Sequence, residues 1–383
     1  MATPTQSVRS EITTSANRLV VKIGTGVLSD ERGQLDTARI EHLAGQICDL
    51  RAEGYGMAVV TSGAIGAGLA ALGIERRPKA TAKLQAAAAI GQSELMAMYD
   101  RCFQAKGFHS AQMLLTRQDF EDFRRYLNMR RTVAALHKFN AIPVINENDT
   151  VSVDEITFGD NDTLSALVAS LFEADLLILL STVDGLYDSD GPTRRVIEVV
   201  DRVTTDVEAL AFGATSRGGV GGMESKLRAV KTVTEFGETV IMANGKQDNV
   251  LRRIVNGENL GTLFLPAARR VAGRKRWLMF GGKTKGKLWI DDGAVEAISK
   301  RGKSLLPSGV TKAEGAFASG DVVAIMSPTG ELVAKGVTGF GHEEAAKICG
   351  LQSKQVAVVV GRKNCDEIVH RDNMVVFHKG QPA

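Results

Sequence analysis

Cysteine and histidine are scarce in this chain of 383 residues, with four of the first and six of the second. No two cysteines are spaced as a Cys-x-x-Cys pair, and the histidines are scattered. This pattern argues against a disulfide framework and against a zinc site, and it favours a reducing compartment. The four cysteines are Cys48, Cys102, Cys349 and Cys365.

Long apolar runs are absent as well. None approaches the 18 residues or so of a membrane-spanning helix, so we expect no membrane segment. The polar first 18 residues lack the apolar core of a signal peptide, and we expect a cytoplasmic protein. Aromatic residues make up only 5% of the chain. The C-terminal part, which holds Trp277 and Trp289, shows no aromatic cluster on which nucleobases could stack.

Charge is distributed unevenly. The net charge is +3, yet the residues from Arg269 onward carry 19 lysines and arginines against 11 aspartates and glutamates. A basic module attracts nucleic acid. The other interpretation is a solvated basic linker between two domains, and the sequence leaves both open.

The first two-thirds of the chain alternates short apolar segments with amphipathic ones. This alternation predicts an α/β fold, an αβα sandwich around a mostly parallel open sheet. A Gly/Ala-rich stretch at 62–68 follows the second strand, and 151–158 has the pattern of a hairpin or an extended flap. We expect strands at 19–23, 57–61, 111–115, 142–145 and 176–180, and helices at 36–53, 80–105, 120–139 and 164–172.

After residue 266 the segments become short and glycines recur. This change predicts a small β-rich domain with one short helix near 343–349. The predicted organisation is a domain at 17–268, a basic linker at 269–285 and the β-rich domain at 286–377.

Small or polar residues follow each expected strand, where ligands bind in open α/β sheets. Lys22 lies inside an apolar strand, which is costly unless its ammonium meets an anion or solvent. Gly24 and Gly26 follow it and would let the backbone approach a phosphate. The alternative for Lys22 is an edge residue whose stem is buried and whose charge reaches water.

A glycine-rich run at 218–222 leads directly into an amphipathic helix with Lys226 in its first turn. Glycines before a helix N-terminus form an anion site, and the lysine adds a charge. The run is not a Walker A motif, because GxxxxGK[ST] is absent. A flexible surface loop is the alternative interpretation.

Asp149, Asp160 and Asp162 are the strongest acidic candidates. Such carboxylates could hold the two lysines, bind a substrate amine or meet a magnesium ion. Any one of them could instead cap a helix. No Ser/His/Asp set and no catalytic cysteine is evident, so the residues together favour a phosphoryl-transfer enzyme.

With these motifs the chain resembles the amino acid kinase family, over about residues 19–370. Within that family it is most similar to the branch that phosphorylates L-glutamate and carries a PUA domain at its C-terminus. Aspartate kinases carry ACT domains instead, and uridylate and acetylglutamate kinases lack a PUA-like tail. The motifs are VVKIGTGVL, VVTSGAIGAG, QMLLTRQDF, VINENDTV, FGDNDTLSALVA, VDGLYDSDGP, GVGGMESKL, RKRWLMFG and GKSLLPSGV.

The resemblance implies ATP-dependent phosphorylation of the γ-carboxylate of L-glutamate, the first step of proline synthesis, with Mg²⁺. It implies that Lys22 and Lys226 contact the phosphoryl groups and that Asp162 holds both lysines. It places glutamate at Ser62, Asn146, Asp149 and Asn161. It places ATP at Lys22, Ser181, Thr182, Val220, Gly221, Gly222, Met223, Glu224, Ser225 and Lys226, and it names no metal-ligating residue.

The resemblance also implies inhibition by L-proline, a homo-oligomer (a dimer or tetramer), and a glutamyl-phosphate reductase as partner. One departure concerns Thr182, because many family members have aspartate there. Two alternatives stay open: a kinase of the same fold for another acid or phosphate substrate, and an RNA-binding protein that acts through its basic tail.

Overall fold

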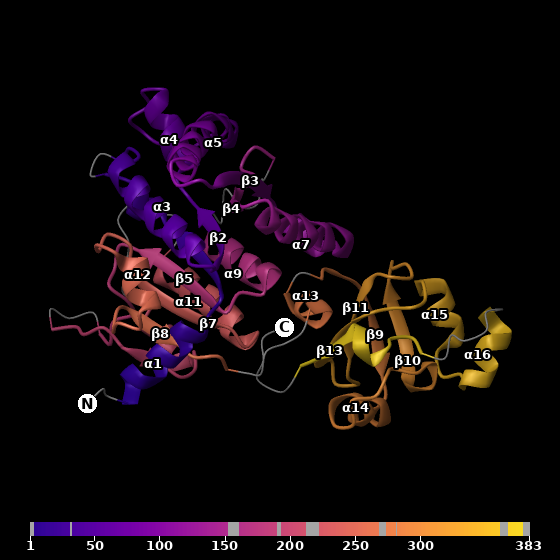
Figure 1. Cartoon of the computed structure of the whole chain (residues 1–383). Coiled ribbons are helices and arrows are strands. Elements are labelled where there is room, and N and C mark those ends of the chain that lie inside the picture. The colour runs from indigo at the N-terminus through magenta and orange to yellow at the C-terminus, as the bar shows by residue number, and fades with distance from the viewer. Residues whose placement is uncertain are drawn as a thin grey trace. The chain divides into compact units, whose positions relative to one another are not determined.

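The chain forms two compact units in a computed structural model (Figure 1). One unit comprises Met1–Asp119 and Arg124–Arg270, and the other comprises Phe120–Phe123 and Val271–Ala383. The sequence-derived boundaries at 17–268, 269–285 and 286–377 stay predictions. The structure describes residues 4–30, 33–151, 161–189, 193–211, 222–267, 273–280, 282–360 and 367–377.

An eight-stranded sheet forms the centre of the first unit, as far as the described residues show, with strand order β3-β4-β2-β1-β5-β7-β8-β6. All neighbouring strands are parallel except β7 and β8. The predicted mostly parallel α/β sheet is therefore confirmed. The strands are β1 (Arg18–Ile23), β2 (Gly56–Thr61), β3 (His109–Leu115), β4 (Ala141–Glu147), β5 (Leu176–Ser181), β6 (Val199–Val200), β7 (Thr239–Asn244) and β8 (Thr262–Phe264).

Helices cover both faces of this sheet. None of those in the described ranges has both the length and the apolar character needed to cross a bilayer. They are α1 (Pro4–Ser15), α2 (Thr25–Leu28), α3 (Thr37–Ala52), α4 (Ala64–Ala71), α5 (Thr81–Gln104), α6 (Arg117–Glu121), α7 (Phe123–Lys138), α9 (Asn161–Phe172), α10 (Thr205–Ala209), α11 (Met223–Glu235) and α12 (Val250–Val255).

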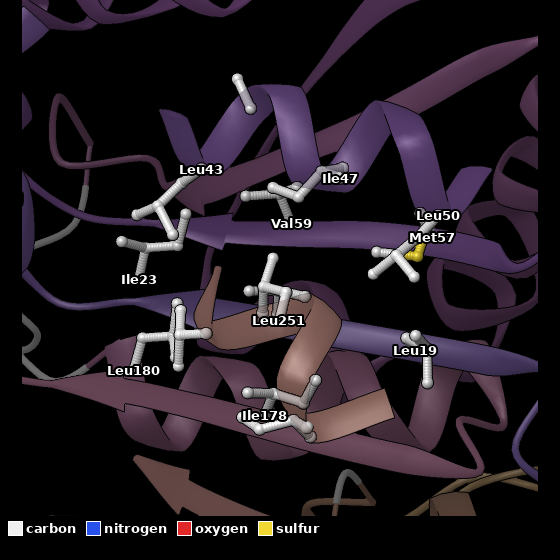
Figure 2. Close-up of a cluster of buried hydrophobic side chains, with 14 of the residues drawn as sticks. Leu19, Ile23, Leu43, Ile47, Leu50, Met57, Val59, Ile178, Leu180 and Leu251 are labelled. Atoms are coloured by element: carbon white, nitrogen blue, oxygen red, sulfur yellow. The ribbon is translucent and has the colours of Figure 1, made fainter. Parts of the chain in front are cut away.

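The main core lies between one face of the sheet and the helices α3, α5 and α12. In Figure 2, Ile23 of β1 lies near Leu43 of α3, Leu19 lies toward the other end of β1, and Leu251 of α12 belongs to the same cluster. All four side chains are fully buried. Since side chains alternate along a strand, the residues between Leu19 and Ile23 divide between this core and the opposite face.

Helix α3 begins where the sequence predicts. The carboxylate of Asp36 accepts a hydrogen bond from the backbone N–H of Arg39 at 3.0 Å, and this N-cap fixes its start. Helix α5 also matches its predicted range. The single helix predicted at 120–139 is wrong, because the chain forms α6 and α7 with a break at Asp122.

The Gly/Ala-rich stretch after β2 forms most of α4, which the sequence analysis did not predict. Gly68 of this helix and Gly91 of α5 serve helix packing. A Cβ at Gly68 would lie 1.8 Å from the carbonyl oxygen of Ala87 in α5, and one at Gly91 would lie 2.0 Å from that of Ala64 in α4. The two helices approach so closely that no side chain fits at either position.

The second unit contains a five-stranded sheet of order β10-β9-β11-β12-β13. Within this second sheet, β9 and β11 are the only parallel pair that the described residues form. The predicted β-rich domain is confirmed. The strands are β9 (Thr284–Ile290), β10 (Val310–Gly315), β11 (Val322–Met326), β12 (Leu332–Val337) and β13 (Met374–Val376).

The expectation of one short helix in this domain is wrong. Helix α15 (His342–Ile348) matches it, but α14 (Asp292–Ser299) and α16 (Ser353–Val360) are present too, and α13 (Gly273–Phe280) lies within the predicted linker. Asp291 caps α14 by accepting from the backbone N–H of Ala294 at 2.7 Å, and Ile298 buries itself in the domain core. Helices of eight residues are too short for a clear periodic pattern.

We predict that Gly91→Ala lowers the free energy of unfolding by about 1–3 kcal/mol, because the added methyl group would overlap the backbone of α4. Gly45→Ala in α3 is the matched control, since a Cβ there meets no atom within 4 Å. Helix propensity predicts that this control gains about 1 kcal/mol. Urea unfolding would measure both variants, and equal stability of the two would contradict the packing argument.

Candidate active site

Lys22 is buried within β1, with 5% of its surface exposed. Its neighbours Val21 and Ile23 pack into the core of Figure 2, so Lys22 points to the opposite face of the sheet. Helix α9 packs against β1, and it supplies the anion that a buried ammonium requires. The alternative of an edge residue that reaches water is thereby excluded.

Asp162 binds both predicted phosphate-contacting lysines. Its side chain, in the first turn of α9, is completely buried. One carboxylate oxygen, Oδ1, forms an ion pair with Nζ of Lys22, and Oδ2 lies 3.0 Å from Nζ of Lys226. Ser225 adds a hydrogen bond from its hydroxyl to Oδ2 at 3.2 Å. The structure therefore brings together the three residues predicted to be catalytic, and we call them the Lys–Asp–Lys cluster.

The charge state of the cluster follows from its geometry. Burial by itself raises the pKa of Asp162, but the charges of Lys22 and Lys226 and their hydrogen bonds outweigh it and hold that pKa well below its usual range. Asp162 is therefore ionised at neutral pH. Two ammonium groups against one carboxylate give the cluster a net charge of +1, which suits an anionic ligand.

Helix α11 positions Lys226 and Ser225 through its first turn. Gly222 is the N-cap residue, and its carbonyl oxygen lies 3.0 Å from the hydroxyl oxygen of Ser225, so it shares the single hydroxyl proton with Oδ2 of Asp162. Met223 is buried at the helix start. Glu224 is exposed and pairs with Arg228 at 2.9 Å, so its carboxylate is engaged along the outer face of the helix.

Some of the predicted site falls outside the described residues. Val220 and Gly221, assigned to the nucleotide site, are among them, as is the acidic candidate Asp160. The same holds for 152–158, nearly all of the predicted hairpin or flap.

A network of polar side chains connects the ends of β2 and β4 to the start of α9. Three acceptors share the two N–H groups of the Asn161 side chain: the carbonyl oxygen of Thr61 lies 2.7 Å from Nδ2, the hydroxyl of Ser62 2.9 Å and Oδ1 of Asn146 2.9 Å. Three of the four residues predicted to bind glutamate are thus within direct hydrogen-bond reach of one another. Because Asn161 directly precedes Asp162, this network adjoins the Lys–Asp–Lys cluster.

Asp149, the fourth predicted glutamate ligand, is half-buried in the turn that follows β4. Asn148 anchors this turn: its backbone N–H donates to the carbonyl oxygen of Leu115 at 2.9 Å, and its side chain accepts from the hydroxyl of Thr150 at 2.6 Å. Asp149 therefore stands at the same sheet edge as Asn146, three residues after it.

Ser181 and Thr182, predicted to line the nucleotide site, stand at the carboxyl end of β5. Ser181 is buried, and its hydroxyl accepts from the backbone N–H of Val183 at 3.2 Å. Thr182 is exposed beside Gly26, where an added Cβ would lie 2.9 Å from the Thr182 methyl group. Helix α2, which follows β1, and the loop after β5 therefore meet at this edge.

Asp184 is a residue that the sequence analysis did not select. Its carboxylate accepts from Asn244 at 3.0 Å, from Gln247 at 3.2 Å and from the hydroxyl of Tyr187 at 3.3 Å. These hydrogen bonds, that from Asn244 foremost, lower its pKa. The loop after β5 thus holds a carboxylate two residues after Thr182. The VDGLY motif contains this aspartate and could have drawn attention to it.

The described residues contain no group of three or more histidine, cysteine, aspartate or glutamate side chains that could hold a metal ion. The carboxylate of Asp162 is already neutralised by two lysines. Magnesium prefers one or two carboxylates together with substrate phosphates.

Comparisons with known proteins identify the family of the chain. The model of the amino acid kinase family matches residues 17–244, and that of the PUA domain matches residues 286–360. The glutamate 5-kinase of Caldanaerobacter subterraneus subsp. tengcongensis is 47% identical over 367 residues, which cover 95% of this chain and 99% of that protein. The glutamate 5-kinase of Syntrophotalea carbinolica is 46% identical over 372 residues, 96% of this chain and all of that protein.

A third relative is the glutamate 5-kinase of Geobacter sulfurreducens, which is 43% identical over 97% of this chain and its own full length. Among solved structures, the UMP kinase of Bacillus anthracis aligns with 66% of this chain and 97% of its own, with a TM-score of 0.46 and 18% identity. The chain belongs to the amino acid kinase family and, within it, to the glutamate 5-kinases.

Proposed function

We propose that the chain transfers the γ-phosphoryl group of ATP to the side-chain carboxylate of L-glutamate, giving ADP and L-glutamyl 5-phosphate. The observation that carries this proposal is the buried Lys–Asp–Lys cluster, with its net positive charge, directly beside the polar network of Ser62, Asn146 and Asn161. The positively charged cluster suits phosphate, and the polar network suits an amino acid. Family membership gives the reaction and its place as the first step of proline synthesis.

The reaction needs no general base. The side-chain carboxyl of free glutamate has a pKa of about 4.3, so it is ionised at neutral pH and is already a nucleophile. One of its oxygens forms a bond to the γ-phosphorus as the bond from that phosphorus to the bridging oxygen of ADP breaks. The electron pair leaves with ADP, and no proton moves in this step.

The main barrier is electrostatic, because an anion attacks a triphosphate. The ammonium groups of Lys22 and Lys226 are held by Asp162 before substrate arrives, so they cost little reorganisation as charge shifts in the transition state. Positioning the two substrates supplies the rest. Magnesium bound to ATP would neutralise part of the phosphate charge.

The substrate sites follow from this arrangement. We assign glutamate to Ser62, Asn146, Asn161 and Asp149, with the carboxylate of Asp149 as counter-ion of the α-ammonium group. We assign the nucleotide to the edge of β1, β5 and α11, where Lys22, Ser181, Thr182 and residues 222–226 lie. The same assignment includes Val220 and Gly221, which are outside the described residues. We propose that Thr182, which is exposed, contacts the nucleotide through its backbone.

Other features stay proposals. They are inhibition by L-proline, assembly into a dimer or tetramer, supply of the labile acyl phosphate to a glutamyl-phosphate reductase, and a cytoplasmic location. RNA binding by the PUA domain also stays an untested alternative.

The proposal is tested by measuring ADP release from ATP and magnesium with L-glutamate, L-aspartate or N-acetyl-L-glutamate, with hydroxylamine to trap acyl phosphates. We expect ADP and hydroxamate with L-glutamate alone. Turnover with another acid instead would overturn the substrate assignment. If the protein is folded and binds ATP but releases no ADP with any of the three acids, the proposed reaction is wrong.

We predict that Lys226→Ala lowers kcat by about 10²–10³, the loss found for one positioned electrostatic group. Lys231→Ala is the matched control: Lys231 lies on the same helix but pairs with Glu208 at 2.7 Å, away from the cluster. Steady-state kinetics on both variants would separate the effects. A kcat for Lys226→Ala equal to that of the control would remove Lys226 from the reaction.

We predict that Asp149→Asn raises the KM for glutamate about tenfold and leaves the KM for ATP unchanged, since the α-ammonium group loses its counter-ion. Kinetics with each substrate varied in turn would show it. A rise confined to the KM for ATP would contradict the assignment of Asp149.

A further inference from the structure

Gln92 of α5 lies in the apolar stripe that this helix presents to the core. Its neighbours in the stripe include Ala88, Leu95 and Tyr99, and Gln92 itself is only 8% exposed. A glutamine at such a position carries a desolvation cost unless its amide is paired. Its Oε1 accepts a hydrogen bond from Nδ2 of Asn146 at 2.8 Å. Gln92 is therefore the outer member of the polar network at the glutamate site.

Backbone groups fix the orientation of the amides of Asn146 and Asn161, and Asn146 in turn fixes that of Gln92. The backbone N–H of Glu147 donates at 2.9 Å to Asn146, so the Asn146 atom facing it must be the oxygen. The other amide atom of Asn146 is then a nitrogen, and it requires an acceptor, which Oε1 of Gln92 supplies. A flipped Gln92 would set two donors against each other.

The second fixed point is Thr61. Its carbonyl oxygen can only accept, so the Asn161 atom facing it must be the nitrogen Nδ2. The remaining atom, Oδ1 of Asn161, is a buried acceptor with no hydrogen-bond donor among the described residues. The network thus contains one buried acceptor that lacks a donor. Leaving such an acceptor unpaired destabilises the protein by about 1–3 kcal/mol.

We propose that Gln92 is a positioning residue of the glutamate site: its Oε1 holds Asn146, and through it Asn161, so that Oδ1 of Asn161 is ready for an ammonium donor of the amino acid substrate. This inference rests on the proposed function and adds a residue to it. Gln92 acts through Asn146 and Asn161 and does not itself take part in phosphoryl transfer.

Two substitutions distinguish this role from simple packing. Gln92→Met keeps the length of the side chain but removes the acceptor, so Asn146 can turn. Gln92→Glu keeps an acceptor oxygen for Asn146 and removes the amide N–H₂. The matched control is Gln46→Met in α3, because Gln46 is also buried and its Oε1 accepts from the backbone N–H of Leu251 at 2.9 Å.

Steady-state kinetics and thermal unfolding of the full chain test the proposal. We expect Gln92→Met to raise the KM for glutamate about tenfold, with kcat changed less and the KM for ATP unchanged, as loss of one oriented hydrogen bond predicts. Gln92→Glu should stay within about threefold of the wild type. Gln46→Met should lose stability but keep both KM values.

The proposal is overturned if Gln92→Met keeps the wild-type KM for glutamate, if Gln92→Glu is impaired as much as Gln92→Met, or if the KM values for glutamate and ATP rise together. Failure of the proposed function is seen separately, because the wild-type chain would then show no glutamate-dependent ADP release.

Discussion

The ion pairs of Asp162 with Lys22 and Lys226 are the constraint on which the site depends. A buried ammonium on β1 is tolerable only with a partner, and one buried carboxylate serves two lysines. Breaking such a pair leaves an uncompensated charge, which costs about 3–5 kcal/mol. The same arrangement presents a net positive charge, so a structural necessity and the chemistry of phosphate recognition coincide.

The topology brings these residues together from distant parts of the sequence. Parallel strands place the ends of β1, β2, β4 and β5 at one edge of the sheet. Helices α9 and α11 both start at that edge, with Asp162 and Lys226 in their first turns. The polar network of Ser62, Asn146 and Asn161 adjoins the cluster, because Asn161 and Asp162 are consecutive residues. Shifting α9 would therefore disturb both substrate sites at once.

Much of this could be predicted from the sequence, because alternating apolar patterns and strand-end motifs are local signals. The parallel sheet was predicted, and Lys22 stood out as a charge within an apolar strand. Gln92 could not be assigned a role, since its partner Asn146 is 54 positions away and the pairing appears only when α5 packs on the sheet. Helix α4 was not predicted, because glycine is a poor helix former. The packing role of Gly68 becomes evident only when the position of α5 is known. Short helices such as α14 were not predicted, because eight residues are too few to show a clear periodic pattern.

The most direct test of the account is the kcat of Asp162→Asn, measured on protein shown by circular dichroism to be folded. Asparagine keeps the size of the side chain and removes the charge that holds the two lysines in place. The account predicts that kcat falls by about 10² or more. A folded variant with the kcat of the wild type would show that the Lys–Asp–Lys cluster is not the centre of phosphoryl transfer.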